Sequence, residues 1–348
     1  MKNKNGLGQF FTTNSKYIIG NLFRYFPIKK LTIIDPFVGN YDLLDILPNY
    51  IETIGYDIDP KQNHTIKQDT LTNPPSYNDK WIITNPPYLA KNNAKTNTLE
   101  SKKTNSDLYE KFKLNDLYKI AIKTIMNCNG GIIIVPLNFF CEEKSSIRNE
   151  FLSNFKILAL NIFEEDVFDD TSYTVCSFFF ERSENKLSEQ NIQANIFPNQ
   201  NKMMVNINQA SNFRFAHEFH SLINVKSKIK ISRLLKDQTP NSNLKLRALD
   251  SGSSDGRIKL TVDDFYFDDT KNKSERSFCT LVFNKNFSIT EQEIIANEFN
   301  LTLEKYRKKY NSLFLTNFRN STSSYARKRI GFETAYQLVT YVISILGI

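Results

Sequence analysis

The sequence predicts an α/β protein: a doubly wound, mostly parallel sheet of seven strands, followed by a C-terminal α+β domain. Two observations carry this prediction. Short apolar runs alternate with helical apolar spacing over about the first 180 of the 348 residues, which is typical of strands joined by helical crossovers. A polar stretch at residues 183–202 then ends the alternation, and the chain beyond it mixes short strands with one long helical run, 289–310.

Seven apolar runs are expected to be strands. The first, at 31–39, is short and closes on Gly39, as expected of a strand buried on both faces. The last two lie close together with no helical segment between them, so we expect them to pair as a hairpin at one edge of the sheet. The seven runs are 31–39, 51–59, 66–71, 81–85, 132–140, 156–164 and 173–182.

Two helices are expected between these strands. Residues 41–50 have helical apolar spacing that stops at Pro48, and residues 115–131 form an amphipathic pattern that ends near Gly130. Between these helices, residues 91–106 contain few apolar side chains and directly follow a Pro-Pro turn. We expect this segment to be a mobile lid.

The second half of the chain is basic. Residues 191–348 contain 23 Lys and Arg against 14 Asp and Glu, a net charge of +9, while residues 1–190 carry a net charge of −1. We therefore divide the chain into a first domain, residues 1–190, and a basic second domain, residues 191–348. An excess of positive charge confined to one module is what binding of a polyanion such as nucleic acid would need.

Composition points to the cytoplasm. No apolar run approaches the roughly 18 residues that a membrane span needs, and the N-terminus has no secretory stretch. The four cysteines are scattered without CxxC spacing, so we expect buried free thiols in a reducing compartment and no membrane partner. His217 and His220 miss the HExxH spacing by one residue, so we expect no metal site.

Polar residues and a glycine stand at the ends of four predicted strands: Asp35 and Gly39, Asp57, Asp69, and Asn85. In an open α/β sheet, ligands bind beyond the carboxyl ends of the strands. An acid after the second strand suits a ribose diol, and a glycine after the first allows close approach of a ligand to the backbone. These residues indicate a nucleoside-type cofactor, although such acids also serve as turn residues and helix caps.

The same region does not suit a phosphate group. Residues 35–42, DPFVGNYD, lack the GxGxxG pattern, since Tyr41 stands where a second glycine would help, and no GxxxxGK[ST] motif occurs. A carboxylate-lined, glycine-poor pocket would repel a pyrophosphate. It would accept a positively charged cofactor without phosphate, such as a sulfonium.

The stretch NPPY at residues 85–88 restrains one amide side chain. Pro86 and Pro87 have no N–H group and restrict the backbone, and a residue before a proline is held extended. Asn85 is therefore fixed at the end of the fourth strand, with Tyr88 behind it. Taken alone, the two prolines could equally serve only to end the strand.

Together these motifs resemble those of the gamma class of N6-adenine DNA methyltransferases, which use S-adenosylmethionine. The resemblance covers about the first 180 residues and implies the S-adenosylmethionine-dependent methyltransferase fold. The sequence departs from the family at Tyr41, where glycine is usual. The motifs follow the family's order: GQFFTT (8–13), DPFVG (35–39), GYDID (55–59), QDTL (68–71), NPPY (85–88) and FEEDVFDDTSYTVCSFFFER (163–182).

The resemblance also assigns roles to single residues. Considered one at a time, Thr12 is also typical of a helix N-cap, and Ile58 and Phe168 are typical of core packing. The expected catalytic residues are Asn85, Pro86, Pro87 and Tyr88, and the expected base-stacking residues are Tyr88 and Phe168. The expected cofactor-binding residues are Thr12, Asp35, Gly39, Asp57, Ile58 and Asp69.

NPPY alone does not determine the substrate, because some RNA adenine or guanine methyltransferases and the enzymes that modify a glutamine of release factors also use it. Basic clusters at 224–236, 304–310 and 323–332 favour DNA. We expect a monomeric, site-specific DNA adenine-N6 methyltransferase that acts on a flipped adenine in duplex DNA. A restriction–modification system, with a cognate endonuclease encoded separately, is the expected setting. A binding protein on a decayed methyltransferase fold is the alternative that the intact NPPY argues against.

Overall fold

The computed structural model describes residues 12–27, 31–91, 99–168, 174–235, 237–250, 256–264, 277–319 and 327–348. The chain divides into two compact units. The first comprises Met1–Phe139 and Ser145–Gln209, and the second comprises Phe140–Lys144 and Ala210–Ile348. This division lies later than the predicted boundary at residue 190, because residues 189–208 form two strands of the first unit's sheet.

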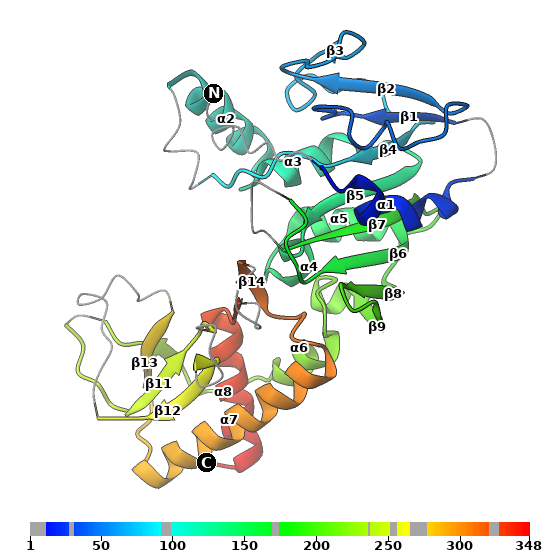
Figure 1. The fold of residues 1–348 in the computed structure, drawn as a ribbon. Helices are drawn as coiled ribbons and strands as arrows, with labels where there is room; N and C mark the ends of the chain where they lie inside the picture. The colour runs from blue at the N-terminus through cyan, green and yellow to red at the C-terminus, as the bar shows by residue number, and fades with distance from the viewer. Residues whose placement is uncertain are drawn as a thin grey trace. The chain divides into compact units, whose positions relative to one another are not determined.

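The first unit is built on a nine-stranded sheet (Figure 1). Across the sheet the strand order is β3-β2-β1-β4-β5-β7-β6-β8-β9. The strands are β1 Thr32–Asp35, β2 Glu52–Asp57, β3 Ile66–Lys67, β4 Trp81–Thr84, β5 Gly130–Pro136, β6 Phe155–Phe163, β7 Val175–Arg182, β8 Glu189–Phe197 and β9 Asn201–Asn208.

The sheet is mixed. Strands β3, β2, β1, β4 and β5 pair in parallel, whereas β7 runs antiparallel to both of its neighbours. The antiparallel pairing of β6 with β7 is therefore confirmed, but its expected position at an edge is wrong. Strand β7 lies between β5 and β6, and β6 pairs on its other side with β8.

The prediction of seven strands is wrong in number, because β8 and β9 extend the sheet. Strand β8 lies wholly within the polar stretch at 183–202, and β9 begins at its end. In β8 every second residue is buried, namely Gln190, Ile192, Ala194 and Ile196. This two-residue period marks a strand with one buried face. The intervening polar residues obscured it.

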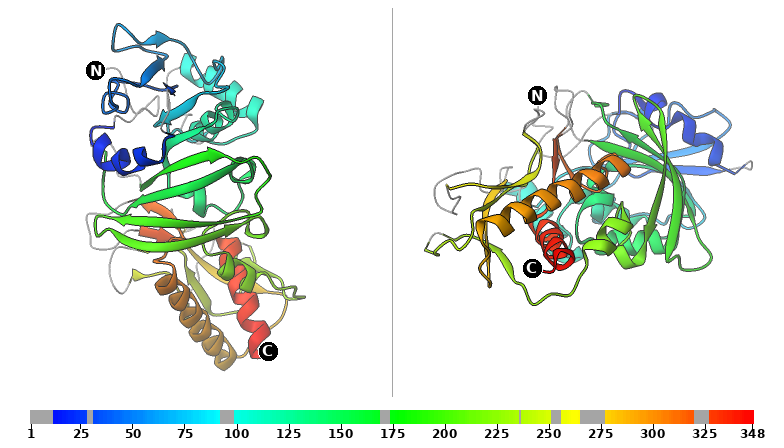
Figure 2. Two further views of the ribbon diagram at one scale, coloured as in Figure 1. Left: turned by 90° about the vertical axis from the view of Figure 1, so that its right-hand side faces the viewer. Right: turned by 90° about the horizontal axis from the view of Figure 1, so that it is seen from below.

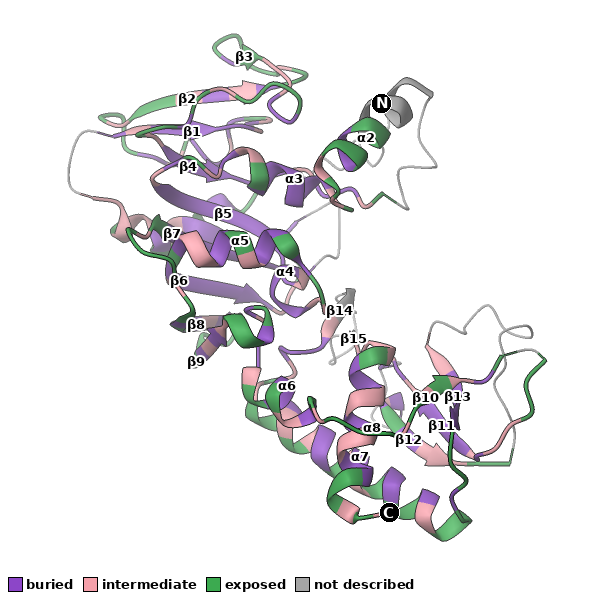
Figure 3. Cartoon of the chain, turned by 180° about the vertical axis from the view of Figure 1, so that it is seen from behind, coloured by how far each residue is buried: buried purple, intermediate pink, exposed green. Residues whose placement is uncertain are grey.

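Helices cover both faces of this sheet. On one face, α1 (Ser15–Ile19) and η2 (Gly20–Tyr25) pack against β7. On the other, α5 (Ser146–Asn154) packs against β6, and α3 (Leu117–Thr124) lies next to α5. Figure 1 shows α1 in front of the sheet, whereas α3 and α5 come to the front in the reverse view of Figure 3. All residues of β5 are buried between these layers.

The helix expected at residues 41–50 does not form. Residues 41–47 make turns instead. Tyr41 has a φ of 75°, in the left-handed region, so it cannot begin a right-handed helix, and Pro48 follows within two turns. Leu43, Leu44 and Leu47 are nevertheless buried, so the apolar spacing reflects packing of a turn.

The expected lid at 91–106 is helical in its second part. Residues 92–98 lie outside the described ranges, and α2 spans Leu99–Phe112. The end of α2 joins the core, since the Tyr109 hydroxyl donates to the Leu89 carbonyl at 2.7 Å.

The second unit contains a four-stranded antiparallel sheet of order β10-β13-β11-β12 and a separate β14–β15 pair. Helix α7 packs on β12 and on α8, and Figure 2 shows α7 and α8 lying against each other. The elements are α6 His217–Ile223, β10 Ile231–Arg233, β11 Leu244–Arg247, β12 Lys259–Val262, β13 Phe278–Phe283, α7 Ile289–Lys309, β14 Thr316–Arg319, β15 Arg327–Arg329 and α8 Phe332–Leu346.

A buried ion pair stabilises this second unit. Arg307 donates to both carboxylate oxygens of Asp250, at 3.0 and 2.8 Å, and both side chains are about 5% exposed or less. The bidentate geometry lets the guanidinium satisfy the carboxylate away from water. Arg307 therefore contributes to the core.

None of the helices in the described ranges is long and apolar enough to span a membrane.

Candidate active site at the carboxyl ends of the strands

The carboxyl ends of β1 and β4 are joined by a buried hydrogen bond. Thr84 Oγ1 donates to Asp35 Oδ1 at 2.7 Å, and the Phe37 N–H donates to the same oxygen at 2.9 Å. Burial raises the pKa of Asp35 to about 7 against the effect of these two bonds, and the Asp57 carboxylate adds to the increase. The site thus holds an acid that changes its charge near neutral pH.

Asp57, at the end of β2, holds the loop that follows β1. Its Oδ2 accepts the Gly39 N–H at 3.0 Å, and its Oδ1 accepts the Asp59 N–H at 2.8 Å. Gly39 has a φ of 54°, which favours glycine. Three of the expected cofactor-binding residues, Asp35, Gly39 and Asp57, therefore lie together at one edge of the sheet.

Tyr41 has a glycine-like backbone conformation in this loop. Its φ is 75°, its side chain is buried, and its ring lies 4.1 Å from the His64 ring between centroids. Gly55 in β2 makes room for it, since a Cβ there would lie 2.6 Å from the Tyr41 hydroxyl oxygen. The tyrosine thus keeps the turn of the loop, and its ring packs against β2 at Gly55.

The two remaining expected cofactor-binding residues at strand ends are Ile58 and Asp69. Ile58 directly follows β2 and is 53% exposed, so an apolar side chain stands at the surface beside the acids. Asp69 follows β3, and its Oδ1 accepts the N–H groups of Leu71 and Thr72 at 3.1 and 3.3 Å. The Thr70 hydroxyl donates to the Pro36 carbonyl at 2.8 Å, which ties this turn to the end of β1.

The carboxamide of Asn85 lies in a buried network. Asn85 Nδ2 donates to Thr12 Oγ1 at 3.0 Å, and the Tyr88 hydroxyl donates to Asn85 Oδ1 at 2.5 Å. The same hydroxyl lies 3.0 Å from the Ile134 carbonyl oxygen in β5. Thr12, Asn85 and Tyr88 are each at most 9% exposed. The structure therefore brings Thr12 to the NPPY motif, and not to the cap position of α1, which Asn14 occupies.

The prolines explain the position of Asn85. Strand β4 is buried along its length between β1 and β5 and ends at Thr84, because Pro86 and Pro87 offer no N–H groups to continue the ladder. Tyr88 packs edge-on against Tyr118 of α3, with centroids 6.2 Å apart at 89°. Burial raises the pKa of Tyr88 well above its ordinary value, so the hydroxyl stays protonated.

Phe168 is 4% exposed and follows the end of β6. Residues 169–173 of the same motif, and residues 8–11 of GQFFTT, lie outside the described ranges. The stacking role expected of Phe168 therefore stays a prediction.

The strand-end residues suit a cationic nucleoside better than a phosphate. Asp35 and Asp57 supply carboxylates, Ile58 supplies an exposed apolar surface, and Gly39 allows close approach of the backbone. Residues 13–17, which follow Thr12, line an open hollow of about 600 Å³ together with Asp42, Asp45 and Ile46. Among the described residues, no group of three His, Cys, Asp or Glu side chains is placed to hold a metal ion.

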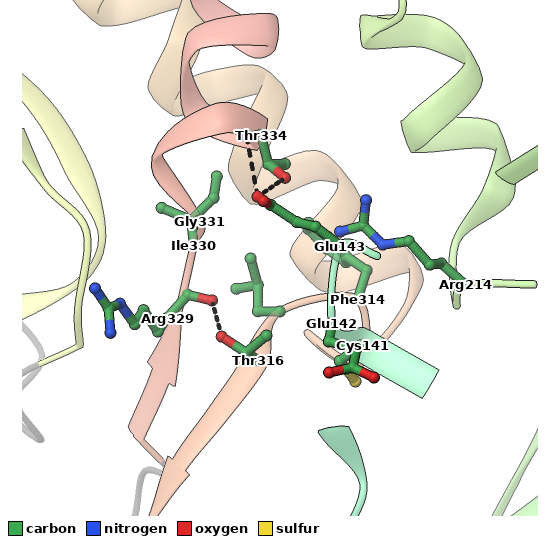
Figure 4. Close-up of a pocket in the computed structure, with 11 residues that line it drawn as sticks. Cys141, Glu142, Glu143, Arg214, Phe314, Thr316, Arg329, Ile330, Gly331 and Thr334 are labelled. Carbon is green, nitrogen blue, oxygen red and sulfur yellow. Dashed lines mark hydrogen bonds between the residues drawn. The ribbon is translucent and has the colours of Figure 1, made fainter. Parts of the chain in front are cut away.

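A second hollow, of about 240 Å³, lies within the second unit (Figure 4). Glu143 borders it and caps α8, because its Oε1 accepts the Thr334 N–H at 3.3 Å and the Thr334 hydroxyl at 2.7 Å. Arg214 also lines it, with an Nε that has no hydrogen-bond partner in the described part of the chain. None of the residues that the sequence singled out as catalytic or cofactor-binding lies here.

Sequence reasoning missed two residues of the first unit's site. Thr84 is a polar residue at the end of an otherwise apolar run, which is a usable signal for a buried hydrogen bond. Gly55 carries no such signal, because its small size matters only through the ring of Tyr41.

Comparison with known proteins identifies one family. The family model described as N-6 DNA Methylase matches residues 49–236, which include the NPPY motif. Among the curated proteins, no match to the chain is found.

Several solved structures show limited similarity. The modification subunit of a putative type I restriction enzyme from Vibrio vulnificus YJ016 has a TM-score of 0.40 and 15% identity over 62% of this chain and 52% of that chain. The type I restriction enzyme EcoKI M protein has a TM-score of 0.37 and 15% identity, over 54% and 49%. The type IIG restriction endonuclease BpuSI has a TM-score of 0.38 and 14% identity over 71% of this chain and 38% of that chain. The chain thus spans about half the length of these proteins or less, and TM-scores below 0.5 carry no functional argument.

Replacing Gly55 with alanine is expected to displace the Tyr41 ring. The added Cβ would overlap the tyrosine hydroxyl, so we expect a loss of about 1–3 kcal/mol in the free energy of unfolding, as for other overpacked cores. Chemical denaturation measures this loss. The double variant G55A/Y41G should recover part of it, and equal stability of G55A and the parent chain would contradict the packing described here.

Stability should fall as pH rises because of Asp35. The folded-state pKa is raised, so the folded chain holds this proton more tightly than the unfolded chain. The contribution is complete below the ordinary pKa of 3.8 and is lost as pH rises to about 7. Denaturant titrations of the parent chain and of Asp35→Asn between pH 5 and pH 8 measure the contribution of Asp35 to the free energy of unfolding. An identical pH profile in the variant would show that Asp35 is not the group responsible.

Proposed function

The chain belongs to the N-6 DNA methylase family, and we propose that it transfers a methyl group from S-adenosylmethionine to the N6 amine of adenine in a specific duplex DNA sequence. The observation that carries this proposal is the placement of Asn85. Its carboxamide is buried at the carboxyl end of β4, one residue after Thr84, which bonds to the Asp35 carboxylate. The proposed setting is a restriction–modification system.

The reaction requires a weak nucleophile to be positioned. The lone pair of an aromatic amine is delocalised into its ring, so the nitrogen attacks poorly. In the proposed mechanism, Asn85 Oδ1 and the Pro86 carbonyl accept the two amine N–H bonds. These fixed acceptors draw the nitrogen towards a tetrahedral geometry, and the gain comes from orientation and preorganised dipoles. The prolines fix the backbone that carries both acceptors.

The cofactor would be held by the strand-end residues. Asp57 would accept hydrogen bonds from the ribose, Ile58 would cover one face of the adenine ring, and Asp69 would accept from its amine. Asp35 and Gly39 would border the methionine end, where the Asp35 carboxylate favours positive charge. When bound, the cofactor would supply a methyl group on a sulfonium. The N–CH₃ bond would form as the S–CH₃ bond breaks, the sulfur would leave as a neutral thioether, and the amine would release one proton to solvent.

The target base must leave the duplex to reach Asn85, since this residue is buried at the carboxyl end of β4. Tyr88 and Phe168 are the proposed stacking residues. In the structure the Tyr88 hydroxyl contacts the Asn85 oxygen that the amine would use. An incoming amine would share this oxygen with Tyr88 or displace it, and loss of the bond would free the Tyr88 ring to face the base.

DNA binding is assigned to the second unit. Two of its basic clusters are partly used in packing: Arg307 pairs with Asp250, and Lys328 is 3% exposed. The cluster at 224–236 differs, because Lys226, Lys228 and Lys230 are all exposed between α6 and β10. These lysines are the proposed phosphate contacts.

The proposal predicts methyl transfer into DNA. With radiolabelled S-adenosylmethionine, the wild-type chain should label duplex DNA pools and should not label RNA or release-factor protein. Asn85→Ala should abolish labelling while calorimetry shows unchanged cofactor binding, since Asn85 acts on the amine. Labelling of RNA or protein alone would overturn the DNA assignment, and a near-normal rate for Asn85→Ala would overturn the mechanism.

Removing the exposed lysines should weaken DNA binding in a salt-dependent way. Replacing Lys226, Lys228 and Lys230 with alanine should lower the slope of log affinity against log salt by about 3, because each phosphate contact releases about one counterion. The matched control replaces three exposed lysines of the first unit, Lys67, Lys156 and Lys202. Equal slopes for both triple variants would exclude the 224–236 cluster from the DNA interface.

A further inference from the structure

The buried bond between Thr12 and Asn85 points to a role for Thr12 that lies outside cofactor binding. A carboxamide has a donating end and an accepting end, and a half-turn of its plane exchanges them. The proposed chemistry needs the accepting end, Oδ1, to face the amine. Something must therefore hold the donating end of Asn85 in the opposite direction.

We propose that Thr12 is the positioning residue that orients the Asn85 carboxamide. Thr12 Oγ1 accepts from Asn85 Nδ2 at 3.0 Å, and the two side chains are 3% and 9% exposed. Because the hydroxyl accepts this bond, its own proton is directed away from Asn85. This inference rests on the proposed function, since orientation matters only if Asn85 serves as an acceptor.

Thr12 is itself held firmly. The Ser15 hydroxyl donates to the Thr12 carbonyl at 2.6 Å, and the Thr12 N–H bonds to the Asp42 carboxylate. The residue is thus fixed on both sides of its Cα before it contacts Asn85. A contact between residues 73 positions apart, made from such a restrained backbone, can set the plane of the amide.

The other end of the amide favours the opposite orientation when Thr12 is lost. The Tyr88 hydroxyl has one proton but two acceptors within reach, Asn85 Oδ1 at 2.5 Å and the Ile134 carbonyl at 3.0 Å. If the amide turned over, Nδ2 would donate to Tyr88, and Tyr88 would donate to Ile134. With valine at position 12, Nδ2 loses its Thr12 acceptor and the turned amide would give it the Tyr88 oxygen instead, so Oδ1 would no longer face the amine.

The test compares Thr12→Val, Thr12→Ser and Thr53→Val. Thr12→Val should lower the single-turnover methylation rate by about 10- to 100-fold and leave the Kd for S-adenosylmethionine within about twofold. Thr12→Ser should restore the rate to within about threefold. Thr53→Val, the same change at an exposed residue of β2 outside the candidate site, should leave the rate unchanged. A normal rate in Thr12→Val, or a loss that appears only as a weaker Kd, would overturn the proposal.

Two further measurements separate orientation from general damage. The effect of Thr12→Val should be smaller in a Tyr88→Phe background, because the turned amide then has no hydroxyl to donate to. With asparagine labelled with ¹⁵N, the Asn85 side-chain amide signal, identified by its loss in Asn85→Asp, should shift in Thr12→Val and not in Thr12→Ser. This signal reports on the hydrogen bond even if the chain methylates no DNA, so failure of this inference and failure of the proposed function are distinguishable. An unchanged signal in Thr12→Val would overturn the inference.

Discussion

The hydrogen bond between Thr84 and Asp35 is the interaction on which the candidate active site depends. A buried carboxylate is costly unless donors surround it, and here one hydroxyl and one backbone N–H converge on the same oxygen. The bond joins the ends of two adjacent parallel strands, β1 and β4. Asn85 is the next residue after Thr84, so its position follows from the same contact.

The acids at this edge of the sheet have a structural task of their own. Asp57 accepts two backbone N–H groups and Asp69 accepts two more, so each carboxylate closes the loop at the end of its strand. A ligand at this edge would meet carboxylates that are already oriented, which reduces the ordering that binding must impose. Substitution of such an acid would accordingly alter the loop as well as the affinity.

The sequence was sufficient for the parts of the fold that follow from local patterning. All seven predicted strands are present, and the long helix at 289–310 matches α7, which a capping box at Ser288 and Glu291 begins. Strand β8 was missed because its buried residues alternate with polar ones in a stretch with a linker-like composition. The turn at 41–47 was taken for a helix because buried leucines give the same spacing in either structure.

The site was predictable only where its residues lie at strand ends. Asp35, Gly39, Asp57 and Asn85 could be placed at one edge because parallel strands end together. The bond from Asn85 to Thr12 could not be foreseen, since it depends on how the segment before α1 packs in three dimensions. The inward ring of Tyr41 is a similar case, because it depends on the absence of a side chain at Gly55.

The pairing of Ala90 with Asp116 lets the segment between them change in length without disturbing the rest of the fold. These residues form an antiparallel bridge, flanked by backbone bonds from Lys91 to Asn115 and from Leu117 to Leu89. Whatever lies between them leaves and re-enters the fold at the same point, beside NPPY. Doubling the length of such an excursion costs only about 0.6 kcal/mol in closure entropy. New sequence can therefore be added ahead of the core-packed end of α2 without moving the NPPY motif, which makes this segment a natural place for divergence among related chains.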